Sequence, residues 1–369
     1  MSAAIPIANL YYLFCYAWGH FKEGDELATD ATKCPHFIDL LGTVLVNGVR
    51  RLRRRGLDRG YVSFEEELRE IRGRIDFGAS LKRSLLSNGK ASCIFDELDH
   101  DILHNRIIKA TLATLLRAEQ LDDGVRRKIQ SLDHELSGIS LVRIQRSDFS
   151  RIQLHRNNVF YSLVLHICRL IYDLMIPMEK TGKAKFSDIR KNEVEMSNLF
   201  EVFVRNFYKA ERNAHKYEVR REYIYWIVSR ATEPDIKYLP RMETDISLES
   251  FDRKIIVDTK FYAKTFNTKQ DGGAPKINSG DLYQVFSYLS NMKPTLPEDM
   301  ALEGMLLYPT TTDNVELSYV LGKHRVRVAT VDLSDDWRAI HDRLLYLISD
   351  NAQKGAEGPQ PLRTNALAV

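Results

Sequence analysis

Residues 241–248 read Arg-Met-Glu-Thr-Asp-Ile-Ser-Leu, and residues 255–262 read Ile-Ile-Val-Asp-Thr-Lys-Phe-Tyr. β-Branched and aromatic residues dominate both stretches, whereas the segment between them, Glu-Ser-Phe-Asp-Arg-Lys, is mostly polar. This pattern predicts two strands joined by a hairpin turn. The remaining elements are interpreted as supports for this hairpin.

Charged side chains interrupt the apolar pattern of both predicted strands. Because side chains alternate across a strand, one face of the first strand is mainly apolar and the other is acidic. The apolar face carries Met242, Thr244, Ile246 and Leu248, and the acidic face carries Glu243, Asp245, Ser247 and Glu249. On the second strand, Asp258 and Lys260 share a face. Charges inside a sheet are unfavourable unless they are paired or bound to a metal, so these two require an explanation.

A carboxylate on each of two neighbouring strands can bind a hard cation that keeps several waters. Mg²⁺ is bound in this way when phosphate oxygens complete its coordination. A lysine two positions from one carboxylate can then position the attacking water and offset negative charge in the transition state. Asp245, Asp258 and Lys260 therefore predict a Mg²⁺-dependent phosphodiester hydrolase.

A structural ion pair is the alternative interpretation of these residues. Asp258 and Lys260 could simply neutralise each other, with Asp245 capping a strand end. The hairpin spacing of the two aspartates and their apolar surroundings favour the metal site.

Composition sets broad limits on the class of protein. The chain has 369 residues, enough for two or three domains, with 44% hydrophobic and 28% charged residues. A net charge of +3 means that any affinity for nucleic acid must come from local patches. The four cysteines have no zinc-ligand spacing, and the apolar residues 5–18 are too short to span a membrane. We therefore expect a cytoplasmic protein with reduced thiols.

The amino-terminal half is predicted to be mostly helical. Residues 37–52 have apolar residues at helical spacing, and they run into Arg-Arg-Leu-Arg-Arg-Arg at 50–55. These arginines could bind phosphate or an acidic partner surface, or they could be a solvated helix end. Further helices are predicted over 124–136 and 158–175. No nucleotide-binding P-loop motif occurs in the sequence.

The carboxy-terminal half is predicted to be α/β. A polar, basic stretch at 180–185 indicates a boundary, so we divide the chain into 1–183, 184–350 and a small, polar tail at 351–369 that is predicted to be disordered. Strands are expected over 217–227, 302–308 and 325–331, and a closing helix over 335–348. The loop 264–279 carries Lys264, Lys269 and Lys276, which could track a DNA backbone.

Two predicted helices carry polar residues whose role depends on the family resemblance given below. Glu201 lies beside the apolar stripe of the helix over 192–208, and from its position it is an ordinary exposed helical charge; a role at the metal site is what the resemblance implies. Tyr283 and Gln284 lie in the first turn of the helix over 281–292, near the strand ends.

Several of these segments resemble the McrC family of the PD-(D/E)XK nuclease superfamily. The resemblance rests on residues 240–246, 256–262 and 282–284, and extends to the Ile-Pro-Ile start and Tyr-Tyr pair of residues 5–18 and to Asn-Arg-Ile-Ile-Lys at 105–109. Thr244 stands where the superfamily often has proline. The resemblance covers nearly the whole chain.

The resemblance implies a fold, an activity and a partner. The carboxy-terminal domain would have a central mixed sheet flanked by helices, with Asp245 and Asp258 binding Mg²⁺, Lys260 positioning water and Gln284 supporting it. Glu201, Glu243 and Tyr283 are weaker candidates for the same site. Residues 1–183 would dock on a hexameric McrB-like AAA+ GTPase ring, which binds the GTP and reads modified cytosine in double-stranded DNA.

Two other functions remain open from the sequence. A non-catalytic adaptor that activates a partner GTPase would explain the helical front half and the missing nucleotide loop. A stand-alone structure-specific nuclease would need no partner.

Overall fold

The computed structural model describes residues 5–27, 34–155, 158–177, 184–211, 217–262, 276–312 and 314–349. The chain divides into two compact units, which we call the helical unit (residues 22–188) and the sheet unit (residues 1–21 with 189–369). Lys264 and Lys269 of the predicted loop lie outside the described residues, and so does the whole predicted tail at 351–369.

The helical unit contains a group of packed helices and a projecting ribbon. The helices are α3 (Phe37–Arg55), α5 (Leu103–Leu116), α6 (Asp123–Glu135), α7 (Arg146–Ser150) and α8 (Phe160–Leu174), with α2 (Phe21–Leu27) crossing the division between the units. A small strand pair, β4 (Met175–Pro177) and β5 (Ala184–Phe186), follows α8. The predicted helices over 37–52, 124–136 and 158–175 are thus confirmed as α3, α6 and α8.

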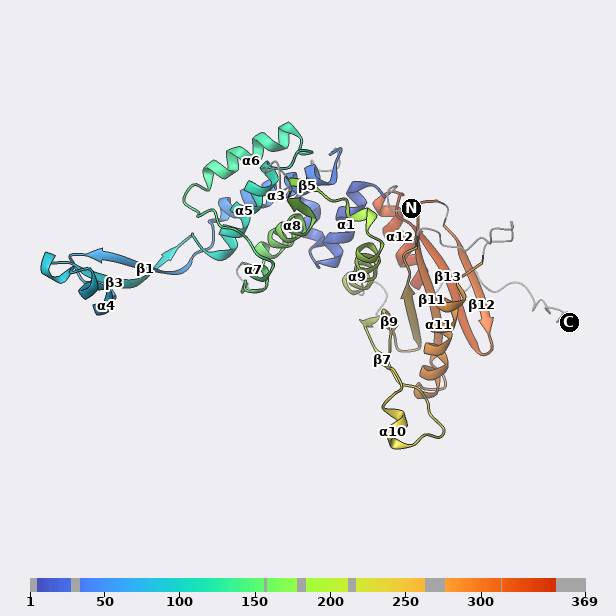
Figure 1. Cartoon of the computed structure of the whole chain (residues 1–369). Helices are drawn as coiled ribbons and strands as arrows, with labels where there is room; N and C mark the ends of the chain where they lie inside the picture. Colours follow the sequence, from blue (N-terminus) through green and yellow to red (C-terminus); the bar gives the residue numbers. More distant parts are fainter. Residues whose placement is uncertain are drawn as a thin grey trace. The chain divides into compact units, whose positions relative to one another are not determined.

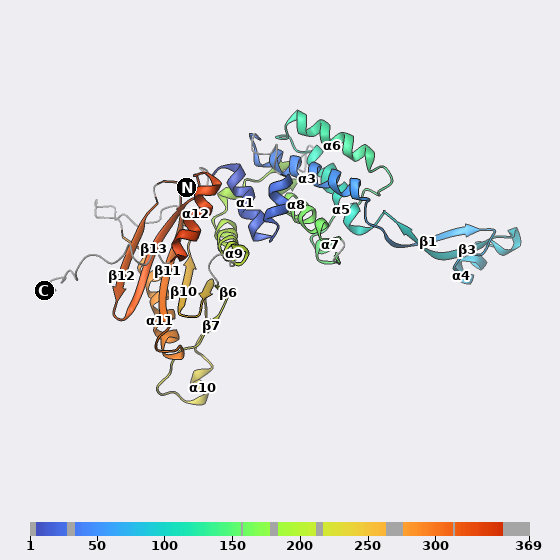
Figure 2. The same cartoon turned by 180° about the vertical axis from the view of Figure 1, so that it is seen from behind.

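The ribbon of the helical unit is antiparallel. It consists of β1 (Gly60–Leu68), β3 (Ala91–Asp99), the short β2 (Arg74–Ile75), α4 (Phe77–Lys82) and a 3₁₀ turn at Leu86–Asn88. Figures 1 and 2 show it extending away from the helices of its own unit. Gly73, at φ +65°, is needed at the bend before β2 because a Cβ there would lie 2.4 Å from the carbonyl oxygen of Ile94.

The sheet unit is built on one six-stranded mixed sheet. The strands lie in the order β12-β13-β11-β10-β9-β6, and only the β10–β11 and β11–β13 pairs are parallel. Their bounds are β6 Glu218–Arg220, β9 Ile246–Glu249, β10 Arg253–Thr259, β11 Ala301–Thr310, β12 Glu316–Leu321 and β13 His324–Asp332. The predicted hairpin is confirmed as the antiparallel pair β9 and β10.

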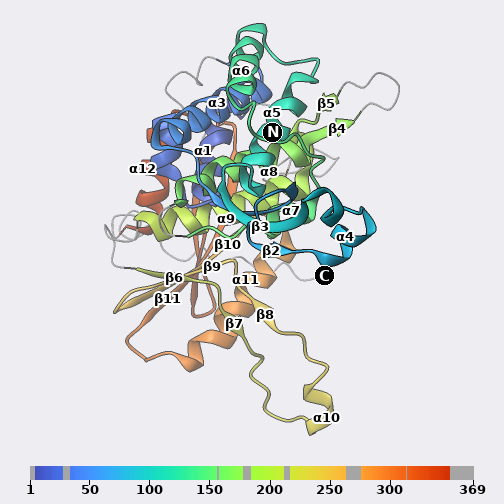
Figure 3. The same ribbon diagram turned by 90° about the vertical axis from the view of Figure 1, so that its left-hand side faces the viewer.

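Helices cover both faces of this sheet. α11 (Ser279–Met292) packs on one face, where Val285 and Leu289 join a core with Ile256 and Leu306. α12 (Trp337–Ile348) and α9 (Glu193–Glu211) contact the other face (Figures 1 and 3). Gly304 of β11 permits the close approach of α11, since a Cβ at this position would lie 2.3 Å from Cγ1 of Val285.

The first helix belongs to the sheet unit, which differs from the predicted amino-terminal module over 1–183. α1 (Ile7–Ala17) packs on α9, where Tyr16 contacts the rings of Phe203 and Phe207. Asn206 also donates to the carbonyl oxygen of Ala17 at 2.8 Å. Aromatic packing between segments far apart in the sequence therefore moves the division to residue 188 and places α1 with the sheet.

The predicted strand over 241–248 is broken, and this expectation was wrong. β8 (Met242–Glu243) pairs with β7 (Tyr223–Ile224) in a separate two-stranded ribbon, whereas β9 joins the main sheet. The predicted strand over 217–227 is split in the same way, into β6 and β7. Thr244 causes the break because its N–H donates to the Glu222 carbonyl and its Oγ1 accepts from the Glu222 N–H, each at 3.0 Å. The β7–β8 ribbon continues to α10 (Glu233–Ile236), as Figure 3 shows.

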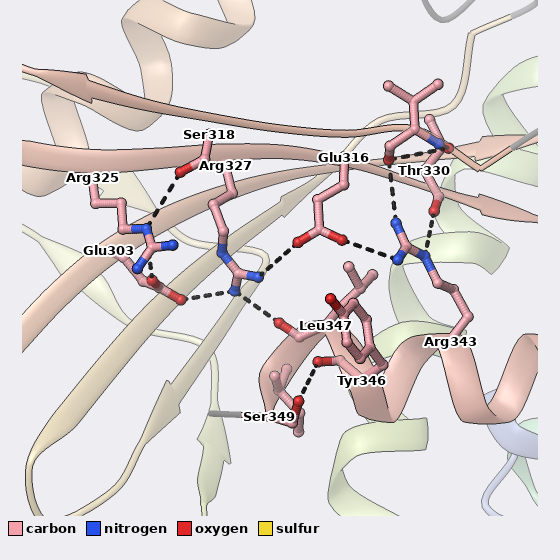
Figure 4. A network of polar contacts seen from close by, with 12 residues as sticks. Glu303, Glu316, Ser318, Arg325, Arg327, Thr330, Arg343, Tyr346, Leu347 and Ser349 are labelled. Carbon is pink, nitrogen blue, oxygen red and sulfur yellow. Dashed lines mark hydrogen bonds and ion pairs between the residues drawn. The ribbon is translucent and has the colours of Figure 1, made fainter. Parts of the chain in front are cut away.

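A buried ion network joins the sheet to α12. Arg327 is fully buried and its Nη2 donates to Oε1 of Glu303 and to the carbonyl oxygen of Leu347, each at 2.8 Å (Figure 4). Arg253 also bonds to Oε1 of Glu303, and it donates to the carbonyl oxygen of Ile348 at 3.1 Å. Two arginines thus satisfy carbonyl groups at the end of α12, where the helix dipole favours cations.

Among the described residues, no helix combines the length and the apolar stretch that a membrane crossing requires.

Replacing Glu303 by alanine is expected to destabilise the sheet unit by about 3–5 kcal/mol, because two buried guanidinium groups lose their shared counter-charge. All three tryptophans, Trp18, Trp226 and Trp337, belong to this unit, so urea unfolding followed by tryptophan fluorescence reports on it. Glu316→Ala is the matched control, since Glu316 also pairs with Arg327 but its side chain is 25% exposed. Equal losses in the two variants would contradict the central role of Glu303.

Candidate active site

Asp245 and Asp258 lie opposite each other on the hairpin. In the antiparallel register Val257 pairs with Ile246, so the next position on each strand brings the two aspartates together. Asp245 occupies the bend between β8 and β9, and its Oδ2 accepts hydrogen bonds from N and Oγ1 of Thr259 at 2.8 and 3.0 Å. The broken strand therefore directs the Asp245 carboxylate across the end of β10.

The Asp258 carboxylate is buried and poorly satisfied. Within the described part of the chain, its one donor is the Lys260 ammonium, whose Nζ lies 2.7 Å from Oδ2, and Oδ1 accepts no hydrogen bond. Burial, followed by the negative charge of Asp245, raises the pKa of Asp258 to about 7 against the opposing effect of Lys260. This carboxylate is therefore ionised at neutral pH only in part, unless a further cation stabilises it.

Lys260 follows β10 directly and joins the strand to α11. Its backbone N–H donates to the carbonyl oxygen of Leu307 at 3.0 Å, and Nζ donates to Oε1 of Gln284 at 2.8 Å. Burial by itself lowers the pKa of Lys260, but the charge of Asp258 outweighs burial and the pKa is raised overall. The side chain is therefore a fixed cation at neutral pH.

Gln284 is held in place by a hydrogen-bond chain. Its Nε2 donates to the hydroxyl of Tyr288 at 2.7 Å, and that hydroxyl donates to the carbonyl oxygen of Glu243 at 2.9 Å. Burial raises the pKa of Tyr288, so it remains a neutral donor. Tyr288 was not predicted as a site residue from the sequence. Its position one helical turn after Gln284 nevertheless places both side chains on one face of α11.

Asp281 is a second residue that the sequence analysis did not select. It is buried at the start of α11 and accepts hydrogen bonds from Tyr308 at 2.8 Å and Tyr262 at 3.1 Å. Burial and the Asp281 charge raise the pKa values of both tyrosines, which stay protonated. Asp281 therefore fixes α11 to β11 beside Lys260.

Glu201, Glu243 and Tyr283 are the weaker candidates: the two glutamates belong to a separate ionic group, and the tyrosine faces solvent. Glu201 pairs with Arg205 at 2.7 Å and with Arg221 at 3.6 Å, and Arg221 pairs with Glu243 at 3.3 Å. Arg205 connects this group to the site because its Nη1 donates to the carbonyl oxygen of Asp245 at 3.4 Å. Tyr283 is 70% exposed.

A hard cation fits the two aspartates. Within the described residues, buried Oδ1 of Asp258 has no hydrogen-bond donor and Oδ2 has only the Lys260 ammonium, and Asp245 presents a second carboxylate opposite them. Within the described ranges, no group of three or more His, Cys, Asp or Glu residues could hold a metal ion. A pair of carboxylates suits Mg²⁺, which keeps water and substrate phosphate among its ligands, better than a cation that requires an all-protein cage.

The chain is similar to known restriction-system proteins over most of its length. The family model of McrBC 5-methylcytosine restriction system components matches residues 8–309. The type IV methyl-directed restriction enzyme EcoKMcrBC of Escherichia coli (strain K12) is 35% identical over 346 residues, which cover 94% of this chain and 98% of that protein.

Two solved structures are also similar. One is a half-complex from a tetradecameric assembly of Thermococcus gammatolerans McrB AAA+ hexamers with bound McrC, with a TM-score of 0.57 and 16% identity over 93% of this chain and 76% of that chain. The other is the Thermococcus gammatolerans McrBC complex, with a TM-score of 0.41 and 21% identity over 58% of this chain and 60% of that chain. Because the identity to the half-complex is only 16%, this similarity shows the fold alone.

The raised pKa of Asp258 predicts a pH dependence of stability. An unfolded aspartate titrates near pH 3.9, so between about pH 4 and pH 7 the folded protein binds more protons at Asp258 than the unfolded chain does. Stability without metal should therefore fall as the pH rises through this window. Asp258→Asn should remove the part of this pH-dependent fall in stability that Asp258 causes.

The test is urea unfolding in EDTA, followed by tryptophan fluorescence at several pH values across this window. Asp299→Asn, at an exposed position of the same unit, is the matched control and should keep the wild-type pH dependence. An unchanged pH dependence in Asp258→Asn would refute this account of the buried carboxylate.

Proposed function

Because the chain belongs to the family of McrBC 5-methylcytosine restriction system components, we propose that it is the nuclease subunit of such a system. In this proposal it cuts double-stranded DNA by Mg²⁺-dependent hydrolysis of a phosphodiester bond. The observation that carries the proposal is the buried Asp258 carboxylate, which lies opposite Asp245 and has the Lys260 ammonium as its donor within the described residues.

Each residue of the site has a defined role in the proposed reaction. Asp245 and Asp258 would hold Mg²⁺, which when bound polarises the scissile phosphate and lowers the pKa of bound water. Lys260 acts as a cation and not as a general base, because its raised pKa keeps it protonated. It orients the attacking water and offsets the charge that develops on the phosphate. Gln284 and Tyr288 hold the Lys260 ammonium in position.

The proposed partner is a hexameric McrB-like AAA+ ring that binds and hydrolyses GTP and recognises modified cytosine. This assignment agrees with the absence of a P-loop motif from the sequence of this chain. It also places the protein in the cytoplasm, where the DNA substrate is.

We further propose that the ribbon of the helical unit docks on this ring. Phe77 and Leu81 lie one turn apart on α4 and are 61% and 66% exposed, and Ile71 is 68% exposed. The ribbon's own core is small, centred on Ala91, Cys93 and Phe95. Exposed apolar side chains gathered at the end of a projecting element are typical of a protein-binding surface.

An adaptor without nuclease activity is the second candidate function. The exposed apolar ribbon favours it, because this surface would activate a partner GTPase whether or not the chain cuts DNA. The unsatisfied Asp258 distinguishes the two functions, since an adaptor has no use for a buried charge at this cost.

Lys260→Ala should reduce cleavage of methylated plasmid by about 10²–10³-fold or more, in the presence of the partner ring, GTP and Mg²⁺. Stimulation of GTP hydrolysis should survive, because Lys260 lies in the sheet unit. Asp258→Ala should have the same effect on cleavage, and it should also abolish the rise in the tryptophan-monitored unfolding midpoint that Mg²⁺ produces in the wild type.

The matched control for Lys260→Ala is Lys209→Ala, at an exposed position of α9. Cleavage that persists in both Lys260→Ala and Asp258→Ala would refute the assigned site. GTPase stimulation without cleavage by the wild type would favour the adaptor, and cleavage without ring or GTP would favour a stand-alone nuclease.

A Phe77→Ala/Leu81→Ala variant should weaken binding to the ring by about 10–100-fold, because buried apolar anchors contribute most of the affinity of an interface. The measurement is the concentration of this chain that gives half-maximal GTPase stimulation. Val320→Ala, a residue 75% exposed on β12 of the sheet unit, is the control. Unchanged half-maximal stimulation in the double variant would show that the ribbon is not the docking surface.

A further inference from the structure

An arginine cluster at the end of α3 has no role in the function proposed above. Five arginines occupy residues 50–55, interrupted only by the buried Leu52. Together with Glu26, Leu27 and Asn47 they line an open hollow of about 930 Å³ in the helical unit. We call this hollow the α3 arginine site.

Three of the five arginines have structural partners. Arg51 pairs with Glu26, and its guanidinium lies 4.6 Å from the ring centre of Phe160 on the neighbouring helix α8 (Figure 2). Arg55 lies 5.4 Å from the same ring, and Arg53 pairs with Glu135 of α6. These contacts join α3 to its neighbours, and cations at the end of a helix are also favoured by its dipole.

Arg50 and Arg54 are not explained in this way. Both are exposed, and neither forms an ion pair within the described residues. They lie four positions apart, so their side chains share a helix face and their Cα atoms are about 6 Å apart along the axis. Like charges at this spacing destabilise a helix. The cluster therefore concentrates positive charge in the hollow beyond what the fold requires.

The character of the hollow favours a polyanion over a protein partner. The cores of protein interfaces are depleted of charge and enriched in apolar surface, yet Leu27, the apolar residue of this lining, is only 5% exposed. Guanidinium groups bind phosphate oxygens in a bidentate manner. Double-stranded DNA presents closely spaced phosphates along a continuous edge.

A second hollow extends the positive surface. It has a volume of about 370 Å³, is also lined by Arg55, and adds Arg59 and His155. Its acidic residue, Asp58, makes contacts within the unit. Oδ2 of Asp58 accepts a hydrogen bond from Nδ2 of Asn158 at 2.7 Å and lies 3.2 Å from Nε2 of His104. The arginines of the two hollows are thus joined through Arg55, and the two carboxylates, Glu26 and Asp58, make contacts within the unit.

We propose that the α3 arginine site binds the phosphate backbone of double-stranded DNA. The helical unit then contributes a DNA contact of its own, independent of sequence, in addition to the contact at the nuclease site. The inference rests on the proposed function only in taking DNA as the polyanion.

The test is fluorescence anisotropy of a labelled duplex with the full chain in EDTA, repeated over a series of KCl concentrations. Arg50→Ala/Arg54→Ala should weaken binding by about tenfold at low salt and reduce the magnitude of the slope of log K against log[KCl] by about 2. Both residues are exposed and their removal relieves a like-charge repulsion, so the variant should have an unfolding midpoint no lower than that of the wild type.

The matched control is Arg127→Ala/Lys128→Ala, which removes two exposed charges from α6 of the same unit. A normal salt slope in this control, with the reduced slope in the α3 variant, supports the site. Equal slope losses in both variants, or none in either, would overturn it. Normal DNA affinity with loss of GTPase stimulation in the α3 variant would also overturn it and assign the arginines to the ring.

Failure of this inference and failure of the nuclease assignment have different signatures. Absence of cleavage by the wild type would affect the nuclease proposal and leave the salt dependence of DNA binding unchanged.

Discussion

The sheet unit depends on one unfavourable feature, the burial of the Asp258 carboxylate with the Lys260 ammonium as its donor within the described residues. Most of its neighbours either compensate this charge or hold a residue that does so. Lys260 supplies a counter-charge, Gln284 orients Lys260, and Tyr288 orients Gln284. Asp245 adds further negative charge, and this destabilising pair of aspartates is what supports the proposed cation site.

The two ends of β10 carry charges in different settings. At its start, Arg253 shares Glu303 with Arg327, and both arginines also bond to carbonyl oxygens of α12. At its other end, Asp258 has Lys260 as its one ion-pair partner among the described residues. The same strand therefore carries one ion network that joins sheet to helix and one carboxylate that we propose as a metal ligand. The apolar middle of the strand separates them.

The two units divide the proposed tasks. The sheet unit holds the carboxylates and lysine that would perform hydrolysis, on a rigid layer of strands and helices. The helical unit offers surfaces instead: an exposed apolar ribbon and the α3 arginine site. The exposed apolar side chains of the ribbon and the exposed Arg50 and Arg54 add little to the packing of their own unit. Their chemistry, one apolar and one strongly positive, suits two different partners, a protein ring and a DNA backbone.

Local sequence determined the hairpin and the positions of Asp245, Asp258 and Lys260, because alternation along a strand and the polarity of a turn are properties of neighbouring residues. Gln284 was selected through family resemblance, and the structure brings it to Lys260. Tertiary structure decided the rest. Thr244 breaks the predicted strand by bonding to Glu222, α1 joins the sheet unit through aromatic packing, and Tyr288 and Asp281 enter the site from α11. Each of these results depends on contacts between residues far apart in the chain, which local patterns do not encode.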